Sequence, residues 1–162
     1  MRQLVLFRHA KAEPSLDERG DFDRALAPAG RNDAPKVAAE ARSAGAAPQV
    51  VLVSAARRTR ETWELAQRFF PDAEVRFLPE LYLASEEALL AAAAAAGADN
   101  VMVIAHNPGL HDLACMLVQD GGEDVDRLHN KLPTAGLVCL ERSDASTEWA
   151  LRAFLTPKAL RG

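Results

Sequence analysis

Short apolar segments alternate along this chain with stretches of helical periodicity, and this alternation constrains the fold more than any other feature. Residues 3–7, 50–53 and 101–105 are almost entirely apolar, and a fourth segment, 74–78, mixes apolar and charged residues. A short apolar run bounded by charge is typical of a strand that is buried on both faces of a sheet. The sequence therefore predicts strands at these four positions.

The stretches between these strands carry the signals of amphipathic helices. Residues 28–44 place apolar side chains at helical spacing and stop at Gly45, a residue type that favours the end of a helix. One apolar face runs from 59 to 70, and another runs from 110 to 118. Ser85 is suited to cap a further helix, which continues through an alanine-rich run. Strands that alternate with helices in this way predict a mostly parallel sheet.

The carboxyl-terminal part of the chain adds a pair of strands. These are predicted at 136–140 and 149–154, around a turn at 143–147. The complete pattern predicts an α/β fold, a three-layer α/β/α sandwich with a mostly parallel mixed sheet. With 162 residues, of which 49% are apolar, the chain suits one compact domain spanning residues 1–162.

Charge and cysteine content exclude some classes of function. The net charge of −4 argues against a general nucleic-acid-binding protein, which presents a basic excess to the phosphate backbone. Cys115 and Cys139 stand apart in apolar surroundings, without the spacing of a metal-binding or redox pair. No segment resembles a secretory signal or is apolar for long enough to cross a bilayer. We therefore expect a cytoplasmic monomer with no membrane or nucleic-acid partner.

Residues with catalytic potential follow three of the predicted strands. Arg8 and His9 follow the first strand, Arg58 lies shortly after the second, and His106 follows the fourth. Ligand sites in open α/β sheets lie at the carboxyl ends of the strands. Clustered cations repel one another unless an anion lies between them, so we expect this edge of the sheet to bind a phosphoryl group.

Two helix starts at this edge carry further expectations. Ser54 is suited to cap the helix after the second strand, so that its first turn projects arginines toward the strand ends. Asn107 is a good N-cap, and Pro108 is a good first residue, for the helix after the fourth strand. His106 would then lie at a positive helix end, which favours an anion.

The order and spacing of these residues resemble the histidine phosphatase superfamily, the phosphoglycerate mutase-like proteins, and within it the short SixA-type phosphohistidine phosphatases. Residues 8–9 match the family's R-H signature, residues 54–62 resemble its S-x-x-x-R-x-x-x-T pattern, and residues 106–108 match its H-x-P. Residues 21–26 resemble the D-x-x-R-x-L segment that precedes the first helix in the family. Residues 78–81 resemble the segment that carries an acid in many members. The resemblance implies a phosphoglycerate mutase-like fold.

This resemblance also implies a metal-independent phosphatase of the phosphoric monoester hydrolase class, which needs no cofactor. It implies that His9 is the nucleophile and forms a phosphohistidine that water hydrolyses. Arg8 and Arg58 would neutralise the phosphoryl oxygens with planar guanidinium groups, and His106 would complete the clamp as a donor. From the residues alone, His9 and His106 could exchange roles.

Other residues near the predicted edge carry open alternatives. Glu80 is the candidate general acid that protonates the leaving group, or else a carboxylate bonded to a loop. Arg24 contacts phosphate or substrate, or else forms a salt bridge with Asp21 that holds its loop. Three lysines are candidates for the mouth of the cleft: Lys11, Lys131 and Lys158.

The segment between Glu80 and His106 bears on the substrate. It has room for only one helix and one strand, so the cap over the site is short. A small ester must be enclosed to be discriminated, whereas an open site suits a phosphorylated side chain on a protein. We therefore expect the substrate to be phosphohistidine on a protein. A small-molecule phosphate-ester phosphatase and a non-catalytic phosphate-binding module are the alternatives.

Three other classes are disfavoured. A mutase would need a second phosphate-accepting pocket and a lid. A metal hydrolase that used His106, His111 and Asp112 lacks the one-turn spacing that places two imidazoles on one helix face. RNA binding by the arginine-rich segment 57–60 is at odds with the net negative charge of the chain.

Overall fold

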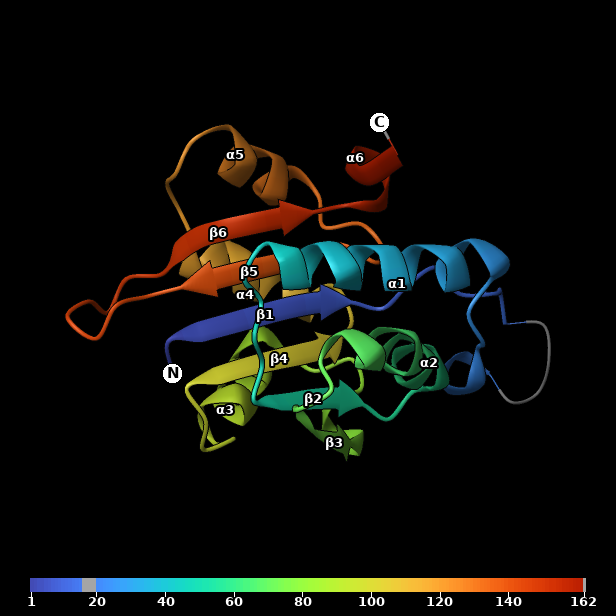
Figure 1. Cartoon of the computed structure of the whole chain (residues 1–162). Helices are drawn as coiled ribbons and strands as arrows, with labels where there is room; N and C mark the ends of the chain where they lie inside the picture. Colours follow the sequence, from blue (N-terminus) through green and yellow to red (C-terminus); the bar gives the residue numbers. More distant parts are fainter. Residues whose placement is uncertain (16–19, 162) are drawn as a thin grey trace.

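The computed structural model describes residues 1–15 and 20–161, in which a single sheet carries helices on both faces (Figure 1). The strands are β1 (Gln3–Arg8), β2 (Val50–Ser54), β3 (Glu74–Leu78), β4 (Asn100–Ala105), β5 (Leu137–Glu141) and β6 (Ala150–Leu155). The α-helices are α1 (Pro28–Ser43), α2 (Arg57–Ala66), α3 (Glu86–Ala94), α4 (Gly109–Leu117), α5 (Glu123–Asn130) and α6 (Pro157–Arg161). Short 3-10 helices are η1 (Asp21–Asp23), η2 (Gln67–Phe69) and η3 (Pro79–Leu81).

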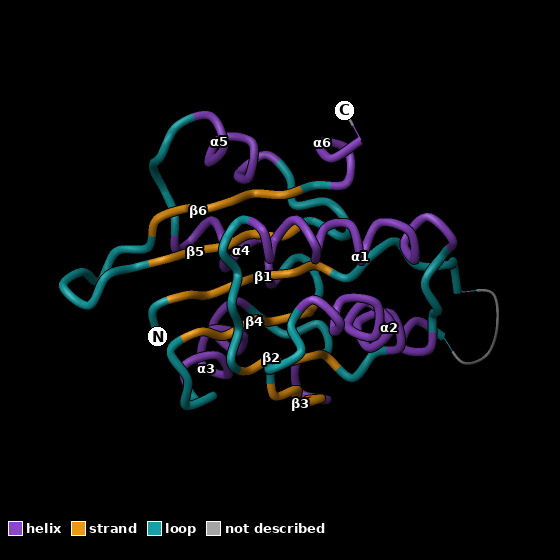
Figure 2. Tube along the Cα trace, viewed as in Figure 1, coloured by secondary structure: helices purple, strands orange, loops and turns teal. Residues whose placement is uncertain are grey.

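The order of strands places β1 inside the sheet, between β4 and β5. The full order is β3-β2-β4-β1-β5-β6, which can be followed in Figure 2. Pairing is parallel from β3 to β1 and antiparallel between β1 and β5 and between β5 and β6. The mostly parallel mixed sheet that the sequence predicts is confirmed. Because β1, β2 and β4 run in parallel, their carboxyl ends meet at one edge, where Arg8 lies in register with Ala105.

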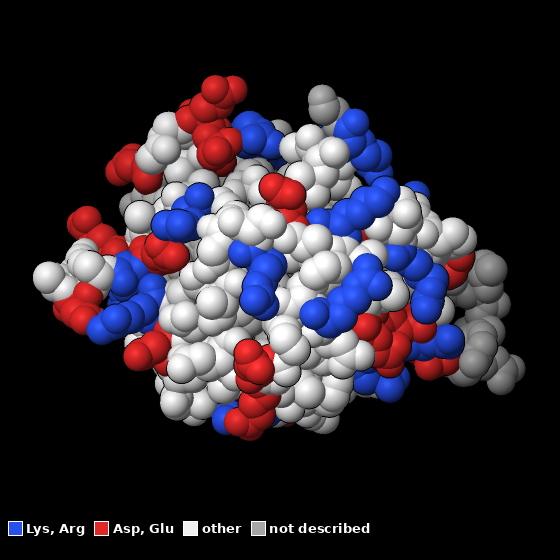
Figure 3. Space-filling view, viewed as in Figure 1, with Lys and Arg blue, Asp and Glu red and all other residues white. Residues whose placement is uncertain are grey.

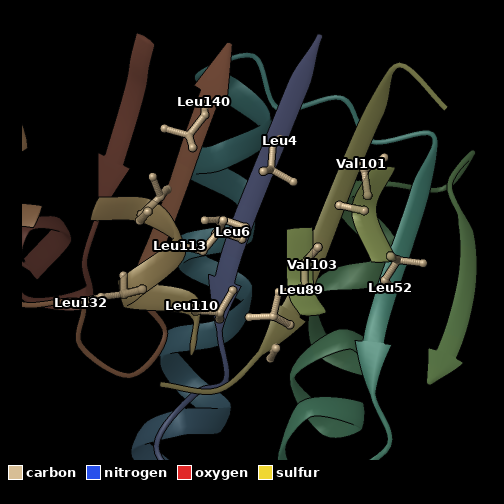
Figure 4. Packing of buried hydrophobic residues seen from close by; sticks show 14 of the residues in the cluster. Leu4, Leu6, Leu52, Leu89, Val101, Val103, Leu110, Leu113, Leu132 and Leu140 are labelled. Carbon is tan, nitrogen blue, oxygen red and sulfur yellow. The ribbon is translucent and has the colours of Figure 1, made fainter. Parts of the chain in front are cut away.

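Two apolar cores fill the space between the sheet and its helices. Successive residues of a strand point to opposite faces, so β1 contributes to both cores. Leu4 and Leu6 face the core that includes residues of α3, α4 and α5, whereas Val5 and Phe7 face α1 and α2. Figure 4 shows the first core, in which Leu110 of α4 is fully buried against the sheet. Helices on both faces confirm the predicted three-layer sandwich.

The first four α-helices lie within two residues of their predicted bounds when α2 is counted with the η2 turn that continues it. The sequence does not predict α5 and α6, which border β6 (Figure 1). Gly122, with φ of 87°, precedes α5, and the acidic residues Glu123 and Asp124 occupy its first turn. Such residues are typical of the start of a helix, although the spacing of apolar residues does not indicate a helix here. None of the described helices is both long enough and apolar enough to cross a membrane.

The start of α1 packs against the chain that follows His9, and Gly30 permits this close approach. A Cβ atom at Gly30 would overlap the backbone carbonyl of Lys11. The Ala27 N–H donates a hydrogen bond to the same carbonyl oxygen at 2.9 Å. Through these contacts α1 supports the backbone that carries His9.

Candidate active site

The backbone around His9 is held by groups from both neighbouring strands. The His9 N–H donates to the Ala105 carbonyl at the end of β4, at 3.2 Å. The His9 carbonyl accepts from the Ala135 N–H at 2.9 Å, and the Arg8 N–H donates to the Gly136 carbonyl at 3.0 Å. His9 is therefore fixed between the end of β4 and the loop that precedes β5.

The His9 imidazole is neutral, and the lone pair of its Nε2 accepts a hydrogen bond from the Arg58 Nε–H. The ring is buried, and its Nδ1 lies 2.8 Å from the Ala10 carbonyl oxygen. Since a carbonyl oxygen only accepts, Nδ1 carries the proton and Nε2 is unprotonated. Burial lowers the pKa of His9 to about 4, and the positive charges of Arg58 and Arg8 act in the same direction. At neutral pH the Nε2 atom is therefore able to act as a nucleophile.

Arg58 places its guanidinium group beside that nitrogen. The side chain is only 3% exposed, and its Nε lies 3.4 Å from His9 Nε2. Its Nη1 donates to the Asp21 carbonyl at 2.7 Å, and its Nη2 donates to Asp21 Oδ2 at 3.0 Å. The predicted phosphate-binding arginine is thus oriented by Asp21, so that its Nε–H donates to His9 Nε2.

The S-x-x-x-R-x-x-x-T pattern has a structural explanation, because each of its three residues contacts the site. Arg58 and Thr62 are four residues apart and share one face of α2. The Thr62 hydroxyl donates to the Arg58 carbonyl at 2.7 Å and accepts from the Ala10 N–H at 3.0 Å. Ser54 does not cap α2 as predicted, because Ala56 is the N-cap residue and the Ser54 hydroxyl binds His106.

His106 lies against His9 at the end of β4. Its ring is 2% exposed, its centroid is 5.4 Å from that of His9, and its Nε2 is 2.7 Å from Ser54 Oγ. Burial above all, and then the neighbouring His9 and Arg58, lower the pKa of His106 to about 3. His106 is therefore neutral as well. Its buried Nδ1 has no hydrogen-bond partner among the described residues.

The start of α4 differs from the prediction at Asn107. The N-cap residue is Pro108 and the helix begins at Gly109, one residue later than expected. The Asn107 side chain does not cap the helix, because its Nδ2 donates to the Leu132 carbonyl at 2.9 Å. Asn107 therefore joins the end of β4 to the loop before β5 and leaves the first N–H groups of α4 without a side-chain cap.

Arg8 approaches the same loop from β1. Its Nη1 donates to the Leu132 carbonyl at 3.0 Å, and its buried Nε has no hydrogen-bond partner among the described residues. Buried polar atoms are nearly always paired, so unpaired ones within a cluster of functional side chains indicate where a ligand would complete the network. Arg8 Nε and His106 Nδ1 both belong to this class. The structure thus brings together Arg8, His9, Arg58 and His106, whose catalytic roles stay predictions.

A second network, centred on Asp21, joins the predicted residues Arg24 and Arg58 to Tyr82. Asp21 Oδ1 accepts from Arg24 at 2.9 Å, which is the salt bridge that the sequence offered as the alternative role for this arginine. Arg24 also donates to the Glu13 carbonyl at 2.6 Å. The Tyr82 hydroxyl donates to Asp21 Oδ2. These hydrogen bonds hold the pKa of Asp21 well below its usual range. The bond from Tyr82 has the largest effect, followed by those from Arg24 and Arg58.

Tyr82 is a residue of the site that sequence reasoning misses. Its ring meets that of His106 edge-on with centroids 5.5 Å apart, and the Arg58 guanidinium lies 5.9 Å from its centroid. Tyr82 also meets Phe22 edge-on at 5.0 Å. No periodicity or spacing marks Tyr82, although it is the only tyrosine in the chain.

Glu80 and the three lysines lie outside the cluster of arginines and histidines. Glu80 is exposed in η3, and its carboxylate makes no hydrogen bond or ion pair with a described residue. Its role as a general acid stays a prediction. Lys11, Lys131 and Lys158 line a separate cavity of about 480 Å³ whose lining includes neither His9 nor His106.

The residues proposed for a metal hydrolase do not converge. His111 Nε2 lies 2.7 Å from the Leu128 carbonyl, so this ring is engaged by α5 rather than turned toward His106. Within residues 1–15 and 20–161, no group of three histidine, cysteine, aspartate or glutamate side chains is arranged to hold a metal ion.

Comparison with known proteins gives a consistent picture. The model of the histidine phosphatase superfamily (branch 1) matches residues 4–82. A crystal structure from Agrobacterium tumefaciens, of a protein assigned as the phosphohistidine phosphatase SixA, superimposes with a TM-score of 0.84 at 33% identity. That match covers 96% of this chain and 98% of the other.

Two curated relatives have similar levels of identity. An uncharacterized protein of Mycobacterium tuberculosis is 34% identical over 82% of this chain and 85% of its own length. An uncharacterized chloroplastic protein of Arabidopsis thaliana is 33% identical over 72% of this chain. The match spans only 59% of the length of the Arabidopsis protein.

Proposed function

The chain belongs to the histidine phosphatase superfamily, and from this premise we propose that it is a phosphatase that removes the phosphoryl group from phosphohistidine on a protein. The observation that carries the proposal is the state of His9. Its Nε2 is unprotonated at neutral pH, and the lone pair of this atom accepts a hydrogen bond of 3.4 Å from the Nε–H of the buried Arg58. A neutral nucleophile beside a fixed cation is the arrangement that attack on an anionic phosphoryl group requires.

In the first step His9 Nε2 attacks phosphorus in line with the leaving group. The Nε2–P bond forms, the bond between phosphorus and the leaving nitrogen breaks, and that nitrogen keeps the electron pair. The Ala10 carbonyl accepts the Nδ1–H throughout, which stabilises the positive charge that develops on the ring. Arg8 and Arg58 offset the charge of the equatorial oxygens.

In the second step a water molecule attacks the phosphorus of the phosphohistidine. The P–O bond forms, the Nε2–P bond breaks, and inorganic phosphate leaves while the imidazole recovers its lone pair. No residue in this sequence of steps requires a metal ion. We therefore propose that turnover is independent of divalent cations.

The acids of the site favour phosphohistidine over a phosphate ester. An alkoxide that leaves from an ester needs a proton, whereas imidazole is expelled more easily from a phosphoramidate. Asp21 is held ionised by Tyr82, Arg24 and Arg58, and the Glu80 carboxyl is exposed. Because neither of these two carboxyls is both buried and protonated, the site is better suited to imidazole, the leaving group that depends less on a proton donor.

The test compares wild type with His9→Gln on a phosphohistidine-bearing protein and on p-nitrophenyl phosphate, with EDTA present. His111→Gln is the matched control, because His111 also bonds a backbone carbonyl but lies outside the site. We expect the His9 variant to lose roughly a thousand-fold or more in kcat/KM and the control to keep its activity. Brief incubation with labelled substrate should also trap an acid-labile phosphoenzyme in wild type only.

Each other outcome assigns a different function. Turnover of the ester alone would identify a small-molecule phosphatase. Phosphate binding without turnover of either substrate would identify a non-catalytic phosphate-binding module. Activity that survives in His9→Gln would exclude His9 as the nucleophile, and activity lost with EDTA would exclude metal independence.

A further inference from the structure

A strongly basic cavity lies beside the histidine cluster, and no step of the proposed reaction uses it. Its volume is about 480 Å³, within the range of sites that bind ligands. In Figure 3, cationic side chains are visible near the carboxyl-terminal end of the chain, at α6. The charged residues that line this basic cavity are Lys11, Arg127, Lys131, Lys158, Arg161 and one carboxylate, Asp33.

The lining of the basic cavity is positively charged, whereas the whole chain has a net negative charge. Its lining has five cations and one carboxylate, an excess of four positive charges, whereas the net charge of the chain is −4. Arg161 pairs with Asp33 at 3.2 Å, and Arg127 pairs with Asp124 at 2.7 Å. The three lysines are exposed and form no ion pair with any residue that the structure describes. This excess of positive charge is therefore available to an anionic partner.

The basic cavity and the active site share a wall. Lys11 is two residues beyond His9 in the chain. Lys131 precedes Leu132, whose carbonyl binds Arg8, and Thr134 of the cavity precedes Ala135, whose N–H binds the His9 carbonyl. Adjacent Cα atoms are about 3.8 Å apart, so Lys11 lies within about 8 Å of His9 along the backbone. A molecule with its phosphoryl group at His9 therefore has its next groups within about one screening length of Lys11, and Lys131 and Lys158 line the same cavity.

We propose that the basic cavity docks acidic side chains that flank the phosphorylated residue of a protein substrate, an inference that rests on the proposed phosphatase function. Charge complementarity selects an acidic partner. The side chains without ion pairs are lysines, whose flexible, hydrated charges suit carboxylates that differ in position from one polypeptide to another. A nucleotide is less well suited, because the one aromatic ring of the cavity, Phe154, is 8% exposed and lies beneath Arg127.

Exposed lysines act through the field they create rather than through rigid contacts. Such charges raise the rate of productive encounter with an oppositely charged protein, and salt screens them. The basic cavity should therefore raise kcat/KM for acidic substrates, with an effect that falls as ionic strength increases. It should leave the chemistry at His9 unchanged, because neither His9, Arg58 nor His106 lines the cavity.

The experiment compares wild type with the double variant Lys131→Glu/Lys158→Glu. The control is Lys36→Glu/Arg68→Glu, which changes the net charge equally at exposed residues that do not line the cavity. Substrates are two decapeptides with a central phosphohistidine, one flanked by glutamates and one by serines, with p-nitrophenyl phosphate as a small substrate. Binding of an unphosphorylated, fluorescein-labelled glutamate peptide is measured by anisotropy, which requires no turnover.

At about 20 mM salt we expect wild type and control to prefer the glutamate peptide by roughly tenfold in kcat/KM. This preference should disappear in the double variant and in wild type near 0.5 M salt. The activity of the double variant on p-nitrophenyl phosphate and its melting temperature should match those of the control. Glutamate-peptide binding should weaken by a similar factor in the double variant only.

The docking role would be overturned if wild type hydrolysed the two peptides with equal kcat/KM. It would also be overturned if the preference for the glutamate peptide fell equally in the double variant and in its control. Tighter binding of ATP than of the glutamate peptide would overturn the choice of ligand. If no phosphohistidine peptide is hydrolysed by wild type, the proposed function fails, and the anisotropy measurement still decides whether the cavity binds acidic peptides.

Discussion

Because His9 is buried, its protonation is unfavourable in the folded protein, and the free energy of unfolding therefore depends on pH. Burial lowers the pKa of His9 from its ordinary value of 6.5 to about 4. Between these two values the folded protein binds fewer protons at His9 than the unfolded chain does, so the free energy of unfolding falls as the pH falls. The contribution is complete above pH 6.5, decreases below it, and is lost near pH 4.

The size of the effect follows from the shift. At 1.36 kcal/mol per pKa unit, the full loss is about 3.4 kcal/mol, of which about 2 kcal/mol is lost between pH 7.5 and pH 5. We therefore expect the free energy of unfolding of wild type to decrease over this interval by about 2 kcal/mol more than that of His9→Gln. Urea denaturation of both proteins at the two pH values measures this difference.

Nuclear magnetic resonance provides the second measurement. The Cε1–H resonance of His9, assigned by its absence in His9→Gln, should shift little between pH 7.5 and 5.5 and titrate only near pH 4. A His9 resonance that titrates near 6.5 would refute the reasoning from burial. So would a variant whose free energy of unfolding falls with pH as steeply as that of wild type.

Three substitutions test the contacts that support the site. Ser54→Ala removes the partner of buried His106 Nε2, and we expect a loss of about 1–3 kcal/mol in urea denaturation; an unchanged midpoint would contradict this. Asp21→Asn removes a negative charge and weakens the contacts that hold the terminal nitrogens of Arg58. In steady-state assays kcat should therefore fall roughly tenfold without a rise in KM. A higher KM at constant kcat would show that Asp21 acts in binding instead. Gly30→Ala places a Cβ against a backbone carbonyl, and the protein should lose about 1–3 kcal/mol of stability by thermal or urea denaturation; a neutral effect would mean that α1 shifts at no cost.

The sequence predicts the sheet and the central residues of the site because both depend on local signals. The apolar run before Arg8 is long enough for one strand only, and its carboxyl end can lie only at the edge where parallel strands end. His106 follows from the same reasoning applied to β4. The positions of these residues are thus set by strand periodicity and chain direction, which a single sequence contains.

The sequence does not predict a contact when the side chain could form a hydrogen bond with any of several groups. Ser54 and Asn107 have the chemistry of helix caps, but in the fold they bind His106 and the Leu132 carbonyl. A tertiary acceptor competes with the helix N–H groups, and local propensity contains no information about it. Tyr82 reaches Asp21 across 61 residues of chain, so its role depends on how two loops fold together.

The central place of β1 also determines when the site can exist. During synthesis β1 leaves the ribosome first, yet its sheet partners are β4 and β5, and β5 ends at Glu141. About 130 residues must be added before both edges of β1 can be paired, which takes roughly 7–26 s at ~5–20 residues per second. Through that interval a strand whose four apolar residues are fully buried in the folded protein has no complete sheet to join. The loop before β5 also binds the His9 carbonyl, so the site cannot be completed until this part of the chain has been made.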